Sequence, residues 1–152
     1  MSYIQNRVVN DADAHVMETV DWLDDFVESR LKTAVRGRLE GSFTTLRNTQ
    51  VAEATAAHAD PDYRARCEAE VMTRKNYWAT GAFLNEDRPL ALDSIGVASQ
   101  LVFPTLCSVT LEALEGEGDI DLLYAFAEAT NRAQVSFCEI DGRLLPVGYV
   151  PL

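Results

Sequence analysis

Apolar side chains recur along the chain with two different spacings, one typical of strands and one typical of helices. β-Branched residues open the segment 8–15, which then alternates small and polar side chains, a pattern that favours a strand ending in polar groups. Residues 99–104 and 144–150 form two further short apolar runs, each shortly after a glycine. We therefore expect three strands, one near the beginning of the chain and two in its second half.

Several segments between these strands have apolar residues at helical spacing, together with recognisable start or stop signals. The expected helices cover residues 20–31, 61–78, 88–95 and 120–138. Candidate N-caps precede them at Thr19, Asp60, Asp87 and Asp119. Glycines and a run of Thr, Asn and Gln weaken the pattern between residues 36 and 59, so we expect a long connection there.

Strands that alternate with helices predict β-α-β units, right-handed crossovers and a parallel sheet. No repeat, low-complexity tract or linker divides the chain, so we expect residues 1–152 to form a single domain. Both faces of a parallel sheet are normally covered, whereas residues 147–152 are apolar with no polar tail after them. We therefore expect the fold to continue beyond the elements seen here.

The net charge of the chain limits the classes of partner that it can bind. Its 24 acidic and 13 basic residues give a formal net charge of -11, which disfavours nucleic acid and anionic membrane surfaces. Three widely spaced cysteines form neither a paired disulfide set nor a C-x-x-C motif, and no secretory signal or membrane-spanning run is visible. We expect a cytoplasmic protein that acts on a small molecule.

Asp13 and His15 are candidate metal ligands at the end of the first expected strand. Side chains two residues apart on a strand point the same way, so a carboxylate and an imidazole would project together. Zinc, manganese and iron accept such an oxygen and nitrogen pair, whereas calcium prefers more oxygens. Asp-x-His is a weak motif alone, and an alternative is local hydrogen bonding of His15 with the aspartates capping or solvating the strand end.

Three blocks of sequence carry a resemblance to a known family. The segment 8–18 resembles the opening of amidohydrolase-related proteins, the branch that includes the aminocarboxymuconate semialdehyde decarboxylase-like enzymes. Residues 87–105 are similar to that family's helix, glycine turn and second strand, and residues 124–152 to its next helix and third strand. The similarity covers most of the chain in order, with residues 36–59 the weakest part.

The resemblance implies the N-terminal part of a TIM-type (β/α)8 barrel, about three β/α units, with a helical insertion between strands one and two. It implies one or two divalent metals, most simply zinc, with Asp13 and His15 as the first two ligands. Glu18 and Thr105 occupy positions that face substrate in such a site. For Glu18, a carboxylate favoured by the positive end of a helix is an equal alternative, and for Thr105 the alternative is strand-end packing.

The chain departs from the family pattern because the remaining metal ligands and the general base have no counterpart in it. A catalytic zinc normally takes three protein ligands. The other histidine, His58, falls in the polar connection and is expected to be solvated. Cys107 follows the second strand, but it has no companion histidine motif and is expected to be a small buried hydrophobe.

Three functions therefore stay open. The first is a metal-dependent hydrolase that attacks a small organic substrate with a metal-activated water. The second is a metal-dependent, non-oxidative decarboxylase of a carboxylated cyclic or enol substrate. The third is a non-catalytic, truncated barrel module that self-associates through an open sheet edge, and a homo-oligomer is expected in any case.

Overall fold

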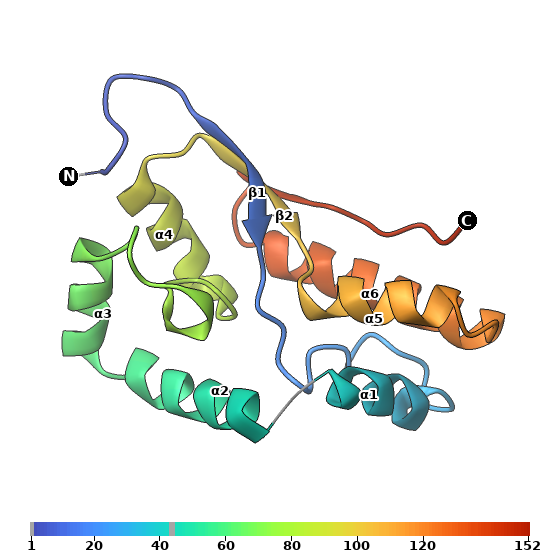
Figure 1. The fold of residues 1–152 in the computed structure, drawn as a ribbon. Coiled ribbons are helices and arrows are strands. Elements are labelled where there is room, and N and C mark those ends of the chain that lie inside the picture. Colours follow the sequence, from blue (N-terminus) through green and yellow to red (C-terminus); the bar gives the residue numbers. More distant parts are fainter. Residues whose placement is uncertain (1, 43–44) are drawn as a thin grey trace.

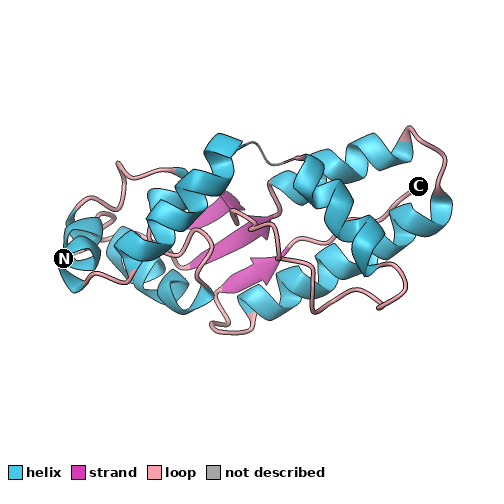
Figure 2. Cartoon of the chain, turned by 90° about the horizontal axis from the view of Figure 1, so that it is seen from below, coloured by secondary structure: helices cyan, strands magenta, loops and turns pink. Residues whose placement is uncertain are grey.

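A three-stranded parallel sheet lies at the centre of the structure, a computed structural model that describes residues 2–42 and 45–152. The strands are β1 (Asn10–His15), β2 (Ser99–Phe103) and β3 (Leu144–Pro146), in the order β1-β2-β3. Figure 2 shows them side by side with their arrowheads in the same direction. The fold is therefore mixed α/β with helices between parallel strands, which confirms the coarse prediction.

The connection from β1 to β2 is long and helical. It contains α1 (Lys32–Gly41), α2 (Thr45–His58), α3 (Pro61–Ala69), two short 3-10 helices η1 (Asn76–Trp78) and η2 (Asn85–Asp87), and α4 (Arg88–Ile95). In Figure 1, α2, α3 and α4 lie on one side of the strands and α1 on the other. A helical insertion between the first two strands is therefore present.

Two predictions within this connection were wrong. Residues 20–31 form successive turns and no helix, and Thr19 bonds the Asp21 side chain where the sequence predicted a cap. The apolar residues of the expected stripe still face inward, since Leu23 is buried and Trp22 and Phe26 pack against the same core. Residues 36–59, expected to be a long connection, contain most of α1 and all of α2.

Two of the four predicted N-caps, Asp60 and Asp119, cap their helices, whereas Asp87 precedes α4 without a side-chain cap and pairs with Arg64. The Asp60 side chain accepts a hydrogen bond from the Asp62 amide at 2.9 Å and starts α3, but this helix ends at Ala69, well short of the predicted 78. Helix α4 ends as predicted at Gly96, where φ is +88° and an added Cβ would lie 2.7 Å from the Ile4 carbonyl oxygen. Glycine is therefore required at that position.

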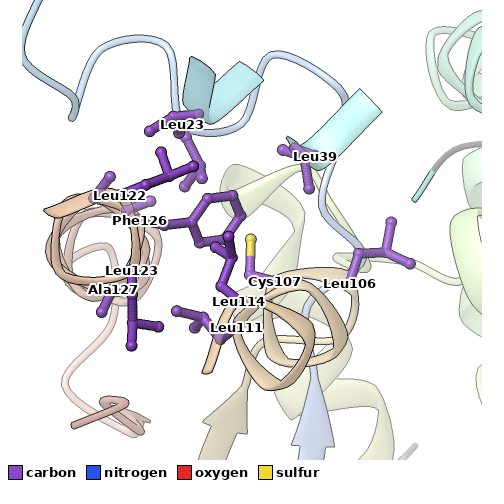
Figure 3. Close-up of a cluster of buried hydrophobic side chains, with 13 residues drawn as sticks. Leu23, Leu39, Leu106, Cys107, Leu111, Leu114, Leu122, Leu123, Phe126 and Ala127 are labelled. Carbon is purple, nitrogen blue, oxygen red and sulfur yellow. The ribbon is translucent and has the colours of Figure 1, made fainter. Parts of the chain in front are cut away.

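The connection from β2 to β3 is an antiparallel helix pair. It consists of α5 (Leu106–Glu115), which the sequence indicated only as a short segment, and α6 (Ile120–Cys138), which begins with Asp119 accepting from the Leu122 amide. These helices and α1 enclose the largest apolar cluster, shown in Figure 3. β3 is three residues long, shorter than predicted. The Val147 amide still donates to the Val102 carbonyl of β2 at 3.0 Å, and the chain then leaves the sheet and runs beside α6 (Figure 1).

The two faces of the sheet differ. Gln100 and Val102 of β2 are buried beneath α4 and α6, whereas Leu101 between them is 38% exposed and Leu145 of β3 is 45% exposed. We call these the covered face and the open face. Among the described residues, no helix combines the length and apolar character needed to cross a membrane.

Candidate functional site

A β-bulge near the end of β1 decides which side chains share a face. Asp11 is opposite Gln100 and Ala14 is opposite Val102, so Ala12 and Asp13 together face the single residue Leu101. Strict alternation would place Asp11, Asp13 and His15 on one face. With the extra residue, Asp11 turns to the covered face, where its Oδ2 accepts from Gln100 Nε2 at 2.9 Å.

Asp13 and His15 remain together on the open face, at the carboxyl end of β1. His15 Nε2 lies 3.3 Å from Asp13 Oδ1, and the two side chains are 45% and 90% exposed. The imidazole also contacts Phe103 of β2, with ring centroids 5.7 Å apart. A carboxylate oxygen and a ring nitrogen therefore converge where a ligand in solution can reach both.

His15 is held by groups on both sides of the sheet. Its carbonyl oxygen accepts from Arg88 Nη1 at 3.2 Å. Its Nδ1 lies 3.3 Å from Thr105 Oγ1, and the Thr105 hydroxyl donates to the Val16 carbonyl at 2.7 Å. The backbone and the far ring nitrogen are thus both fixed, leaving Nε2 directed at Asp13.

Glu18 lies at the first turn of α5 and is fully buried. Its carboxylate accepts hydrogen bonds from the backbone N–H groups of Thr105, Leu106 and Cys107, at 2.8, 2.9 and 3.1 Å. A negative charge is stabilised there by the helix dipole and by amides that lack helical partners. The sequence suggested that Glu18 stabilises the start of a helix that follows it directly. The helix whose first turn it binds is α5, which begins almost ninety residues later.

Thr105 therefore contacts two of the three candidate site residues of the first segment, His15 and Glu18. Its amide donates to Glu18 and its hydroxyl faces His15, so it links the ends of β1 and β2. The structure brings Asp13, His15 and Thr105 together at this strand end and places the Glu18 carboxylate beneath them, in the protein interior. The substrate-binding roles of Glu18 and Thr105 stay predictions.

Sequence reasoning missed a buried polar network under β1. Arg88 is 6% exposed, and its guanidinium donates to Gln100 Oε1 at 3.0 Å and to the Gly81 carbonyl at 3.0 Å, in addition to His15. Burial lowers the pKa of Arg88, against the raising effect of Cys138 and Asp11. A glutamine within an apolar strand run and an arginine at the start of a helix were the signals that could have revealed it.

His58 was expected to be a solvated loop residue, and this was wrong. It ends α2, is 2% exposed, and places Nε2 3.0 Å from the Tyr77 carbonyl oxygen. Tyr63 and Phe83 pack edge-on against its ring. His58 is therefore a core residue of the helical insertion.

The donors present fit part of a zinc site. Two donors held about 2.0–2.1 Å from one tetrahedral zinc ion lie about 3.3 Å apart, and Asp13 Oδ1 and His15 Nε2 are separated by 3.3 Å. Within residues 2–42 and 45–152, no three His, Cys, Asp or Glu side chains gather closely enough to hold a metal. Asp13 and His15 can thus supply two ligands, and the described residues offer no third.

All three cysteines are buried. Cys67, Cys107 and Cys138 are buried free thiols, which agrees with the interpretation of Cys107 as a small buried hydrophobe. Burial, and next the charge of Glu18, raise the pKa of Cys107 well above its ordinary value. A thiol in that environment stays protonated at neutral pH.

The chain matches no protein-family model, no curated protein and no solved structure.

Proposed function

We propose that this chain is the N-terminal part of a metal-dependent enzyme of the amidohydrolase superfamily, with Asp13 and His15 as the first two ligands of a divalent ion. The observation that carries the proposal is their convergence at 3.3 Å on the open face, at the carboxyl end of a parallel strand. Active sites of β/α barrels lie at that end of the strands. Zinc is the first choice, with manganese and iron as alternatives.

The open face of the sheet supports a barrel. In a TIM-type barrel one face of every strand meets helices and the other meets the barrel interior. Here Gln100 and Val102 face helices, whereas Leu101 and Leu145 are partly exposed on the opposite face. Further strands closing over that face would bury these leucines and enclose Asp13 and His15.

Hydrolysis of a small organic substrate is the reaction we favour, with a non-oxidative decarboxylation of a carboxylated substrate as the alternative. When bound, a divalent ion would lower the pKa of a coordinated water from about 15.7 to about 7 or polarise a substrate oxygen. The residues of this chain would orient that ion: Asp13 and His15 by binding it, Thr105 and Arg88 by holding His15 in place. Three reduced thiols suit the cytoplasm that we propose as its location.

A non-catalytic module that self-associates is the second candidate. The observation in its favour is the same exposed pair, Leu101 and Leu145, on a sheet whose outer strands β1 and β3 each have an unpaired edge among the described residues. Light scattering over a range of concentrations tests it. A monomer at every concentration would contradict both this candidate and the expected homo-oligomer.

Paramagnetic Mn²⁺ tests the metal proposal even if two ligands bind weakly. We expect Mn²⁺ to broaden the NMR signals of Asp13 and His15 first. In Asp13→Ala, we expect the same broadening to require an Mn²⁺ concentration at least about tenfold higher. Asp25→Ala is the control, because Asp25 is an exposed aspartate in the turns before α1, outside the strand end. Broadening centred elsewhere, or equally sensitive to both substitutions, would overturn the proposal.

A further inference from the structure

The carboxylate of Asp11 is hydrogen-bonded through both of its oxygens. Oδ1 accepts from the backbone amide of Asp13 at 3.0 Å, and Oδ2 accepts from Gln100 Nε2 at 2.9 Å. A bulge takes backbone groups out of the ladder between two strands, and an amide left there needs another acceptor. Asp11 therefore holds the backbone of one candidate ligand, Asp13, and is itself bonded to β2.

Gln100 connects Asp11 to Arg88. Its Oε1 accepts from Arg88 Nε at 3.0 Å, and Nη1 of the same guanidinium donates to the carbonyl oxygen of His15 at 3.2 Å. Gln100 and Arg88 are 5% and 6% exposed, so water competes little for these bonds. A continuous series of hydrogen bonds therefore runs through three side chains, from the amide of Asp13 to the carbonyl of His15.

The chemistry of each member of this series determines what its neighbour must be. A guanidinium has only N–H donors, so the Gln100 amide presents its oxygen to Arg88. The Nε2 group of that amide then points to position 11, where only an acceptor makes a favourable contact. We propose that Asp11, Gln100 and Arg88 are positioning residues. Their hydrogen-bond series fixes the backbones of Asp13 and His15, and so keeps the two candidate ligands together on the open face.

The open face itself supplies little to hold Asp13. The Asp13 side chain is 90% exposed, and its partner there is the His15 ring at 3.3 Å. An exposed contact of this kind contributes little to stability. The position of the carboxylate therefore depends on the backbone that the series holds from the covered face. The use of this geometry to bind a divalent ion rests on the proposed function, whereas the series itself does not.

An exchange of the carboxylate and the amide tests the series. In Asp11→Asn, the new NH2 group must face either Gln100 Nε2 or the Asp13 amide, and both of these are donors. In Gln100→Glu, the new carboxylate meets that of Asp11, and two acceptors face each other. The double variant Asp11→Asn/Gln100→Glu keeps the net charge and restores a donor and an acceptor at every contact from Asp13 to Arg88.

The solvent-exchange rate of the Asp13 amide proton, measured by NMR in the metal-free chain, reports its contact with position 11. We expect each single variant to exchange about three- to tenfold faster than the wild type, the effect of losing one hydrogen bond, and the double variant to return to within about twofold of it. Gln100→Leu removes the bonds without changing the charge and should behave like the other single variants. Its matched control is Gln134→Leu, a second buried glutamine that faces Val102 from α6, and it should leave the rate unchanged.

The double variant decides the outcome. If it exchanges as fast as either single variant, or does not fold, the inference is overturned. Folded single variants with the wild-type exchange rate, or a Gln134→Leu protein that exchanges as fast as Gln100→Leu, would overturn it as well. A single variant that does not fold, beside a double variant that does, supports the series, because only the paired exchange restores the bonds.

Metal binding forms a separate arm, in which the two leucine variants are compared because neither changes the charge. Gln100→Leu should need an Mn²⁺ concentration about three- to tenfold higher than Gln134→Leu to broaden the Asp13 and His15 signals. If Mn²⁺ binds near Asp13 in no variant but the amide responds as expected, the metal proposal fails and the positioning role stands. If Mn²⁺ binds equally in both variants and the amide does not respond, the positioning role fails and the metal proposal stands.

Discussion

The two groups of helices beside the sheet differ in the size of their apolar clusters. On the side of α1, α5 and α6, 13 buried side chains form one apolar cluster, with Phe126 and Leu111 fully buried (Figure 3). On the side of α2, α3 and α4, the described residues form a cluster of four around Tyr77 and Phe83, and Leu92 of α4 belongs to a cluster of seven that also includes residues of the sheet and of α6. Buried polar residues there, His58, Asp87 and Arg88, make hydrogen bonds and an ion pair.

This difference predicts opposite sensitivities to substitution. An apolar cluster is stabilised by the volume it fills, so it tolerates a change of shape and responds to a loss of atoms. A buried hydrogen-bond network responds to the loss of one partner even when the volume is kept, because the remaining groups stay desolvated. The three predictions below test this, from the largest expected effect to the smallest.

Phe126→Ala should lower the free energy of unfolding by about 3–5 kcal/mol, since Phe126 is fully buried among the leucines of α1, α5 and α6. Urea denaturation followed by circular dichroism measures it. Val109→Ala, on the exposed side of α5, is the control and should change stability by about 0.5 kcal/mol or less. A loss below about 1 kcal/mol for Phe126→Ala would mean that the apolar cluster is not the main source of stability in this group of helices.

Arg88→Met should cost about 3 kcal/mol although it keeps most of the side-chain volume. The substitution leaves Gln100 Oε1 and the carbonyls of His15 and Gly81 without their buried donor. Leu111→Met in the other helical group is the matched swap and should cost less than about 1.5 kcal/mol. Equal losses in the two variants, measured by the same urea titration, would remove the contrast between the two sides.

The pH dependence of stability probes Cys138, which lies near Arg88 at the end of α6. Burial raises the pKa of its thiol from 9.0 to about 11, and the charge of Arg88 acts in the opposite direction. Between these values the unfolded chain loses the thiol proton and the folded chain keeps it, so stability falls as pH rises through this window.

The expected loss is about 2 kcal/mol relative to Cys138→Ala, which lacks the titrating group and serves as the reference. Urea denaturation at pH values below and above this window measures it in both proteins. Parallel declines of the two proteins would show that Cys138 does not titrate differently in the folded state.

The strands and the ends of α4 and α6 could be predicted because their signals are local. Gly96 closes α4 through its own positive φ, and Asp119 caps α6 through an amide three residues away. Residues 20–31 were misread because turns with hydrogen bonds three residues apart, such as Phe26 to Leu23, place apolar side chains at intervals close to those of a helix. Helices α1 and α2 were missed because they bury few residues, and Gly37 and Gly41 face open space.

The candidate site was predictable only in part for a similar reason. Asp13 and His15 are two residues apart, so their convergence follows from strand geometry. The contacts of Glu18 with α5 and of Arg88 with His15 join segments that are 73 or more residues apart. Such contacts depend on how β1 and β2 pair, and the sequence of neither segment alone contains that information.

The extra residue in β1 also determines how many negatively charged side chains lie on the open face. It leaves one aspartate beside the histidine and sends the other to Gln100. A divalent ion held by one carboxylate and one neutral imidazole would keep a net positive charge, whereas two carboxylates would have neutralised it. On a protein with an overall charge of -11, that local excess would be a point of attraction for a small anionic molecule.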